Sequence, residues 1–106
     1  MDRPRWLSVS INEKGIEEYD YGVEDTENIR TFLLDYSEFE VLYNVGGIFD
    51  KINDSCNLLI DDYESEIITK EHFNKCKELI QDQNVPIFAE ALNLAIKYDT
   101  LLGLDF

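Results

Sequence analysis

The start of the chain alternates between apolar and polar positions, which is the period of a half-buried strand. The first predicted strand covers residues 6–11 and places Leu7, Val9 and Ile11 on one side. A turn follows, and renewed alternation over 16–21 predicts a second strand. Together these segments predict a β-hairpin near the N-terminus.

Two later segments alternate in a similar way. Residues 38–43 predict a strand that is broken by the glycines 46–47. Residues 58–60 and 63–68 predict strand with a tight turn between them. The pattern over 48–54 fits either a short helix or a loop.

Helical spacing first occurs between these strands. Asp25 or Thr26 can cap a helix that runs to about Asp35, because apolar side chains recur at i, i+3, i+4 and i+7. These side chains are Ile29, Phe32, Leu33 and Tyr36.

The last third of the chain is predicted to be mainly helical. Thr69 is the expected N-cap of one helix, whose apolar stripe is Phe73, Cys76, Leu79 and Ile80. A second helix is predicted over 86–98, with Pro86 at a permitted first-turn position. The apolar tail 101–106 predicts an edge strand.

This order of elements predicts an α+β fold. We expect a mainly antiparallel sheet of 4–5 strands with about three helices packed on one side. A chain of 106 residues is expected to form a single domain over 1–106. Its apolar content of 44% is sufficient for a core.

Charge is the most uneven property of the chain. The net charge is −14, and residues 12–66 hold sixteen Asp or Glu against three basic residues, a net of −13. The remaining residues hold seven acids and six bases. Such an asymmetry indicates a face that meets a positive partner. Nucleic acid and anionic lipid would be repelled, so neither is an expected direct partner.

The N-terminal residues lack the apolar stretch of a signal peptide, and no apolar run approaches the ~20 residues that span a bilayer. Two cysteines in a chain of this size suggest reduced thiols, so a cytoplasmic location is expected.

Motifs for catalysis or cofactor binding are weak, and we expect no enzyme activity and no cofactor. Cys56, His72 and Cys76 could supply metal ligands, but they lack CxxC or HExxH spacing. Calcium binding near Asp50 or Asp61 lacks the order of ligands of an EF-hand. We therefore expect no catalytic, cofactor-binding or metal-binding residues.

Acidic residues interleaved with aromatic ones form the strongest candidate site. Tyrosine is enriched at protein interfaces, and carboxylates beside it can pair with Arg and Lys. The competing interpretation is a set of solvated strand faces. The expected partner-binding residues are Glu17, Glu18, Tyr19, Asp20, Tyr21, Glu38, Glu40, Asp61, Asp62, Tyr63, Glu64 and Glu66.

In size, charge, absence of catalytic motifs and the C-terminal helix that runs into residues 98–106, the chain resembles bacterial immunity proteins of polymorphic toxin and contact-dependent growth inhibition systems. The resemblance implies a 1:1 complex with a cognate toxin domain. A nuclease is the expected toxin, since its basic active-site cleft would account for the acidic residues of this chain. Two alternatives stay open: a phage-type DNA mimic (anti-restriction or anti-CRISPR), and a small metal-binding module.

Overall fold

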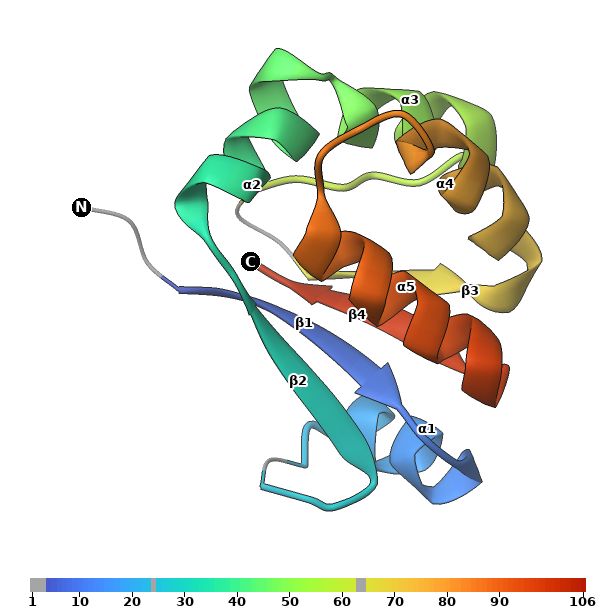
Figure 1. The fold of residues 1–106 in the computed structure, drawn as a ribbon. Helices are drawn as coiled ribbons and strands as arrows, with labels where there is room; N and C mark the ends of the chain where they lie inside the picture. Colours follow the sequence, from blue (N-terminus) through green and yellow to red (C-terminus); the bar gives the residue numbers. More distant parts are fainter. Residues whose placement is uncertain (1–3, 24, 63–64) are drawn as a thin grey trace.

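A computed structural model describes residues 4–23, 25–62 and 65–106. Four antiparallel strands form one sheet in this part of the chain, in the order β2-β1-β4-β3 (Figure 1). The strands are β1 (Arg5–Ser10), β2 (Ile29–Leu34), β3 (Glu66–Thr69) and β4 (Leu101–Asp105). The α+β class and the antiparallel sheet predicted from the sequence are confirmed.

The helices lie on both faces of this sheet. Their bounds are α1 (Glu13–Asp20), α2 (Tyr36–Glu40), α3 (Ile48–Cys56), α4 (Phe73–Ile80) and α5 (Pro86–Tyr98). A π-helical turn (Val41–Val45) follows α2, and a 3-10 turn (Lys70–His72) precedes α4. Helices α2–α5 pack on one face, and α1 packs on the other near the end of β1 (Figure 1). The prediction that all helices lie on one side was therefore wrong for α1.

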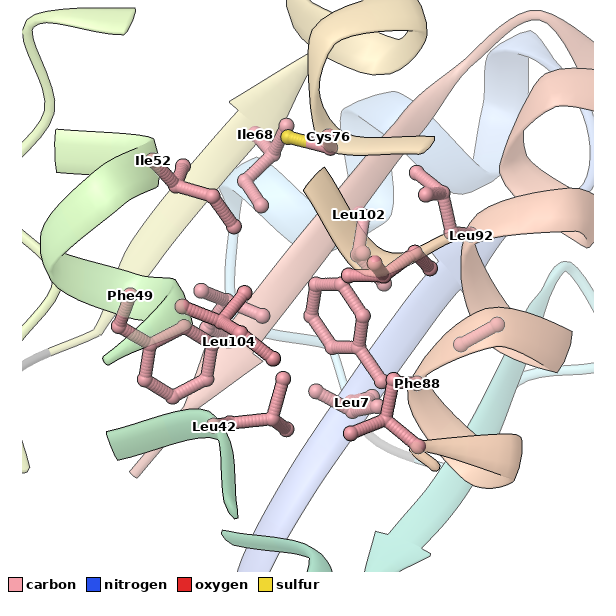
Figure 2. Close-up of a cluster of buried hydrophobic side chains, with 14 of the residues drawn as sticks. Leu7, Leu42, Phe49, Ile52, Ile68, Cys76, Phe88, Leu92, Leu102 and Leu104 are labelled. Carbon is pink, nitrogen blue, oxygen red and sulfur yellow. The ribbon is translucent and has the colours of Figure 1, made fainter. Parts of the chain in front are cut away.

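The core lies between the sheet and α2–α5. Leu7 and Val9 of β1 and Leu102 and Leu104 of β4 are fully buried there. Figure 2 shows side chains from the helices meeting Leu7, Leu102 and Leu104, with Phe88 of α5 near the centre. Strand β4 pairs with β1 on one side and with β3 on the other, so it is a central strand, and its prediction as an edge strand was wrong.

Residues 16–21, predicted as a strand, lie mainly in helix α1. The side chain of Asn12 accepts a hydrogen bond from the Gly15 N–H at 2.8 Å, which is an N-cap contact. At the other end Gly22 has φ +73°, and the N–H of Val23 donates to the Glu18 carbonyl at 2.9 Å. This pair of features is a Schellman ending. Asn12 and Gly22, which also fit the turns of a hairpin, are therefore the caps of a helix.

Two further predictions assigned the wrong secondary structure. The helix predicted up to Asp35 is strand β2, where Phe32 and Leu34 face the helices and Leu33 faces away. The strand predicted over 38–43 is α2 and the π turn, because Phe39 and Leu42 reach the core at helical spacing. Tertiary contacts decide between helix and strand where a short apolar pattern fits both.

The remaining predictions agree more closely with the structure. Helix α5 has the predicted bounds 86–98. Residue Thr69 precedes the 3-10 turn and α4, although its side chain makes no cap hydrogen bond to the helix. The ambiguous segment 48–54 lies in helix α3, and among the described residues of 58–68 the only strand is the part of β3 that begins at Glu66.

Candidate partner-binding surface

The face of the sheet that points away from α2–α5 is only partly covered. Strand alternation places Trp6 and Ser8 of β1 on this face, together with Gly103 and Asp105 of β4, because Trp6 pairs with Asp105 and Ser8 with Gly103. Helix α1 covers one end of the face. We call the rest of it the open face.

Helix α1 is held on the sheet by a close backbone approach. A Cβ atom on Gly15 would lie 2.2 Å from the Asn28 carbonyl oxygen and 3.2 Å from Cβ of Ser10. Only glycine fits this contact without a backbone shift. The sequence therefore places a glycine inside α1, despite its poor helix propensity, to bring the helix onto β1.

Tyr19 of α1 crosses the open face to reach β4. Its hydroxyl donates to Oδ1 of Asp105 at 2.7 Å, and the Ser8 hydroxyl donates to Oδ2 at 2.6 Å. Burial and the Asp105 hydrogen bond raise the pKa of Tyr19, so this residue stays a neutral donor. The ring fits because residue 103 is glycine: a Cβ there would lie 2.1 Å from the Tyr19 hydroxyl.

A groove of about 990 Å³ lies between the α1–β2 connection and the open face. Its lining contains three acidic side chains, Asp25, Glu66 and Asp105, and no Lys, Arg or His among the described residues. The other lining residues are Trp6, Ser8, Tyr19, Gly22, Val23, Thr26, Ile29, Thr31, Ser65 and Ile67. The groove is thus mixed apolar and acidic.

One of the segments that contribute to the groove is strongly acidic, although Asp25 is its one acid among the described lining residues. Residues 13–28 contain seven Asp or Glu and one Lys, a net charge of −6. Among them, Glu17, Asp20 and Asp25 are exposed, and Tyr21 beside them is 75% exposed. We call the exposed acids of residues 13–28 the acidic margin.

Glu18 has a different role from its neighbours. Its carboxylate accepts hydrogen bonds from the Thr26 hydroxyl at 2.6 Å and from the Asn28 amide at 2.9 Å. These bonds, that of Thr26 first, lower the pKa of Glu18. Glu18 thereby ties the connection to α1 and shapes the groove wall.

The second predicted cluster, in 61–66, reaches the groove through Glu66, whose carboxylate also accepts from the Leu59 N–H at 3.1 Å. Asp62 instead pairs with buried Arg5 through two contacts of 2.7 and 3.1 Å. Asp61 is exposed. The predicted residues Tyr63 and Glu64 lie outside the described residues.

Glu38 and Glu40 do not join this surface, because they lie on α2 in the helix layer. Glu38 is 5% exposed, and its carboxylate accepts from the backbone N–H groups of Ile87 at 3.1 Å and Phe88 at 2.6 Å. Burial raises the pKa of Glu38, although these two donors act to lower it. Glu38 is therefore a cap for α5, supplied from another helix.

Of the three residues considered for a metal site, the two cysteines are brought together, since the Cys56 and Cys76 side chains are hydrogen-bonded, but His72 does not complete a set of three with them. Cys56 and Cys76 are both buried in the core, and His72 lies on the 3-10 turn beside Glu71. Among the described residues, no three His, Cys, Asp or Glu side chains have an arrangement that could hold a metal ion. Burial raises the pKa of the Cys76 thiol to about 12, as expected for a packing residue.

The sequence prediction missed the floor of the groove. Trp6 and Ser8 are the outward positions of the predicted strand 6–11, so alternation alone could have placed them on the face away from the core. Asp105 is an acid within an apolar tail, but its pairing with Trp6 depends on β4 being central. That position could not be read from local spacing.

Comparison with models of protein families, with curated proteins and with solved structures found no match. No helix in the described ranges has the length and apolar character needed to cross a membrane.

Proposed function

We propose that the chain is a small inhibitor that binds a basic protein domain through the acidic margin and the groove, in the manner of bacterial immunity proteins. The preferred partner is a toxin nuclease, bound 1:1 in the cytoplasm. A nuclease cleft must be positive to hold phosphates, and occlusion by carboxylates would exclude its substrate.

One observation carries this proposal: members of both predicted acidic clusters line one groove. Tyr19 and Glu66 come from segments that are distant in the sequence, and they lie on the same groove together with Asp25. Val23 of the lining adds exposed apolar area, and Tyr21, two residues earlier in the chain, is exposed as well. This mixture of apolar anchors and charge is typical of protein interfaces.

The DNA-mimic alternative receives less support. It expects acids that follow phosphate spacing along one elongated face. The molecule measures 35 × 33 × 23 Å, and its densest acid is confined to α1 and the connection that follows it. Catalysis is also not proposed, because the described lining of the groove contains no His, Cys or Lys, and the Ser8 hydroxyl that donates to Asp105 belongs to a residue only 5% exposed.

The proposal is tested by capture followed by an activity assay. The immobilised chain is exposed to lysate of the native organism, and the bound protein is identified by mass spectrometry. The purified partner is then assayed for nuclease activity against rising amounts of the chain. We expect a basic protein whose activity falls to zero at one equivalent.

Charge-reversal variants test the surface. Glu17→Lys with Asp20→Lys should weaken binding and reduce its salt dependence. Glu78→Lys and Glu90→Lys, exposed acids on α4 and α5, are the matched controls. Equal losses in both sets, or a captured protein that stays active when saturated, would refute the proposal.

A further inference from the structure

The floor of the groove contains an aromatic side chain directly beside a carboxylate. Trp6 of β1 and Asp105 of β4 are cross-strand partners on the open face. The Cβ atoms of such partners lie about 4.5–5.5 Å apart. Trp6 is 41% exposed, so its ring is accessible from the groove.

The Asp105 carboxylate is held in a fixed orientation. Each of its oxygens accepts one hydroxyl hydrogen bond, from Tyr19 and from Ser8, at 2.7 and 2.6 Å. A carboxylate oxygen has a second lone pair, so both oxygens can accept another donor. No basic side chain of the described residues lines the groove to use these positions.

We infer that this pair is a recognition site for an arginine side chain of the partner, carried on an extended segment that lies along the open face. This inference rests on the proposed function, because it names the group that a basic partner would insert. A guanidinium can donate to both oxygens of a carboxylate while its face stacks on an indole ring.

The surroundings fit an extended segment better than a single side chain alone. Leu33 continues the row on the other side of Trp6, and it is 52% exposed. Ile67 and Thr31 lie in the next row, paired through Gly103 and Ser8. A chain with arginine between apolar residues would bury the exposed Trp6 and Leu33, because Tyr19 already covers Gly103, while Asp25 and Glu66 balance further positive charge.

The test uses a defined probe, an acetylated and amidated pentapeptide with one arginine flanked by valines. The control peptide carries citrulline, which has nearly the same shape and no charge. Trp6 is the only tryptophan, so intrinsic fluorescence reports binding at this site. We expect a saturable change with the arginine peptide at low salt, and about tenfold weaker binding with citrulline.

Asp105→Asn keeps an acceptor for one hydroxyl and should fold, which a urea unfolding curve checks. This substitution should weaken binding of the arginine peptide about tenfold and leave binding of the citrulline peptide unchanged. Trp6→Leu should weaken binding of the arginine peptide a few-fold, with binding measured from backbone NMR chemical shifts. Peptides that bind equally, or shifts confined to the exposed α1 acids Glu17 and Asp20, would overturn the inference.

The captured partner separates the two proposals. If Asp105→Asn leaves its binding unchanged while the Glu17 and Asp20 reversals abolish it, the arginine site is wrong and the inhibitor proposal stands. If no basic partner exists but the arginine peptide still binds through Asp105, the inhibitor proposal is wrong, and the groove is still a binding site for an arginine side chain.

Discussion

Removal of the Glu38 carboxylate gives the sharpest test of the packing between α2 and α5. Helix α5 begins after Val85, which offers no side-chain cap. Its N–H groups at Ile87 and Phe88 donate instead to Glu38. Glu38→Ala would leave the buried N–H of Phe88 and the half-buried N–H of Ile87 without their acceptor.

The size of the effect follows from opposing terms. Two hydrogen bonds to a charged group would give about 3–6 kcal/mol if they simply added. Burial raises the pKa of Glu38, so part of this gain is offset by removing the charge from water. Loss of an N-cap costs ~0.5–2 kcal/mol. We therefore expect Glu38→Ala to lower the free energy of unfolding by about 2–3 kcal/mol.

Urea unfolding followed by far-UV circular dichroism measures this change, and the melting temperature should fall by roughly 10–20 °C for a domain of this size. Glu40→Ala is the matched control on the same helix. Within the described part of the chain, Glu40 accepts only from Asn44, at 3.1 Å, and its loss should change stability by less than about 0.5 kcal/mol. Equal effects of the two substitutions would refute the capping role.

Three further outcomes are expected. Gly103→Ala should cost about 1–3 kcal/mol of unfolding free energy, because its Cβ meets the Tyr19 hydroxyl, and the cost should shrink in a Tyr19→Ala background. Glu18 has a lowered pKa when folded, so its stabilisation is present above its ordinary value of 4.5 and is lost as pH falls through the folded value. The stability difference between wild type and Glu18→Gln, measured by urea unfolding, should therefore be larger at pH 7 than at pH 3. The Cys76 thiol, buried and with a pKa near 12, should react with an aromatic disulfide reagent at pH 8 only after urea is added.

Each of these outcomes has a clear contrary result. An undiminished cost of Gly103→Ala in the Tyr19→Ala background would mean that another contact fixes the glycine. A Glu18→Gln difference that does not change with pH would remove the Thr26 and Asn28 bonds as its cause. Rapid labelling of native Cys76 would show that the core around it opens readily.

Local sequence signals predicted the elements whose apolar stripe is long. Helix α5 repeats its buried positions over thirteen residues and starts at Pro86, so its bounds followed from spacing and proline geometry. Helix α1 has eight residues and buries only Gly15, so its apolar pattern carried little information. Asn12 and Gly22 signal caps as well as turns, and only the packing of α1 on β1 separates the two.

The candidate site divided in a similar way. Acid and tyrosine in 17–21 were visible in the sequence, and Tyr19 does line the groove. The role of Glu38 was not visible, because its hydrogen-bond partners lie 49 and 50 residues further along the chain. Asp62 is similar, since its contact with Arg5 spans 57 residues. A count of charges cannot distinguish acids that hold the fold from acids that are available to a partner.

The central place of β4 has a consequence for how the chain reaches its native state. Strand β1 has one neighbour formed by residues 29–34, but its other neighbour comes from residues 101–105. Strand β3 also depends on β4 for its pairing. The sheet cannot close until residues 101–105 have left the ribosome, and until then the apolar edge of β1 is open to other chains. We therefore expect slow, cooperative folding. If the chain is concentrated, or is released from chaperones, before β4 has paired, it should aggregate rather than form a stable partial structure.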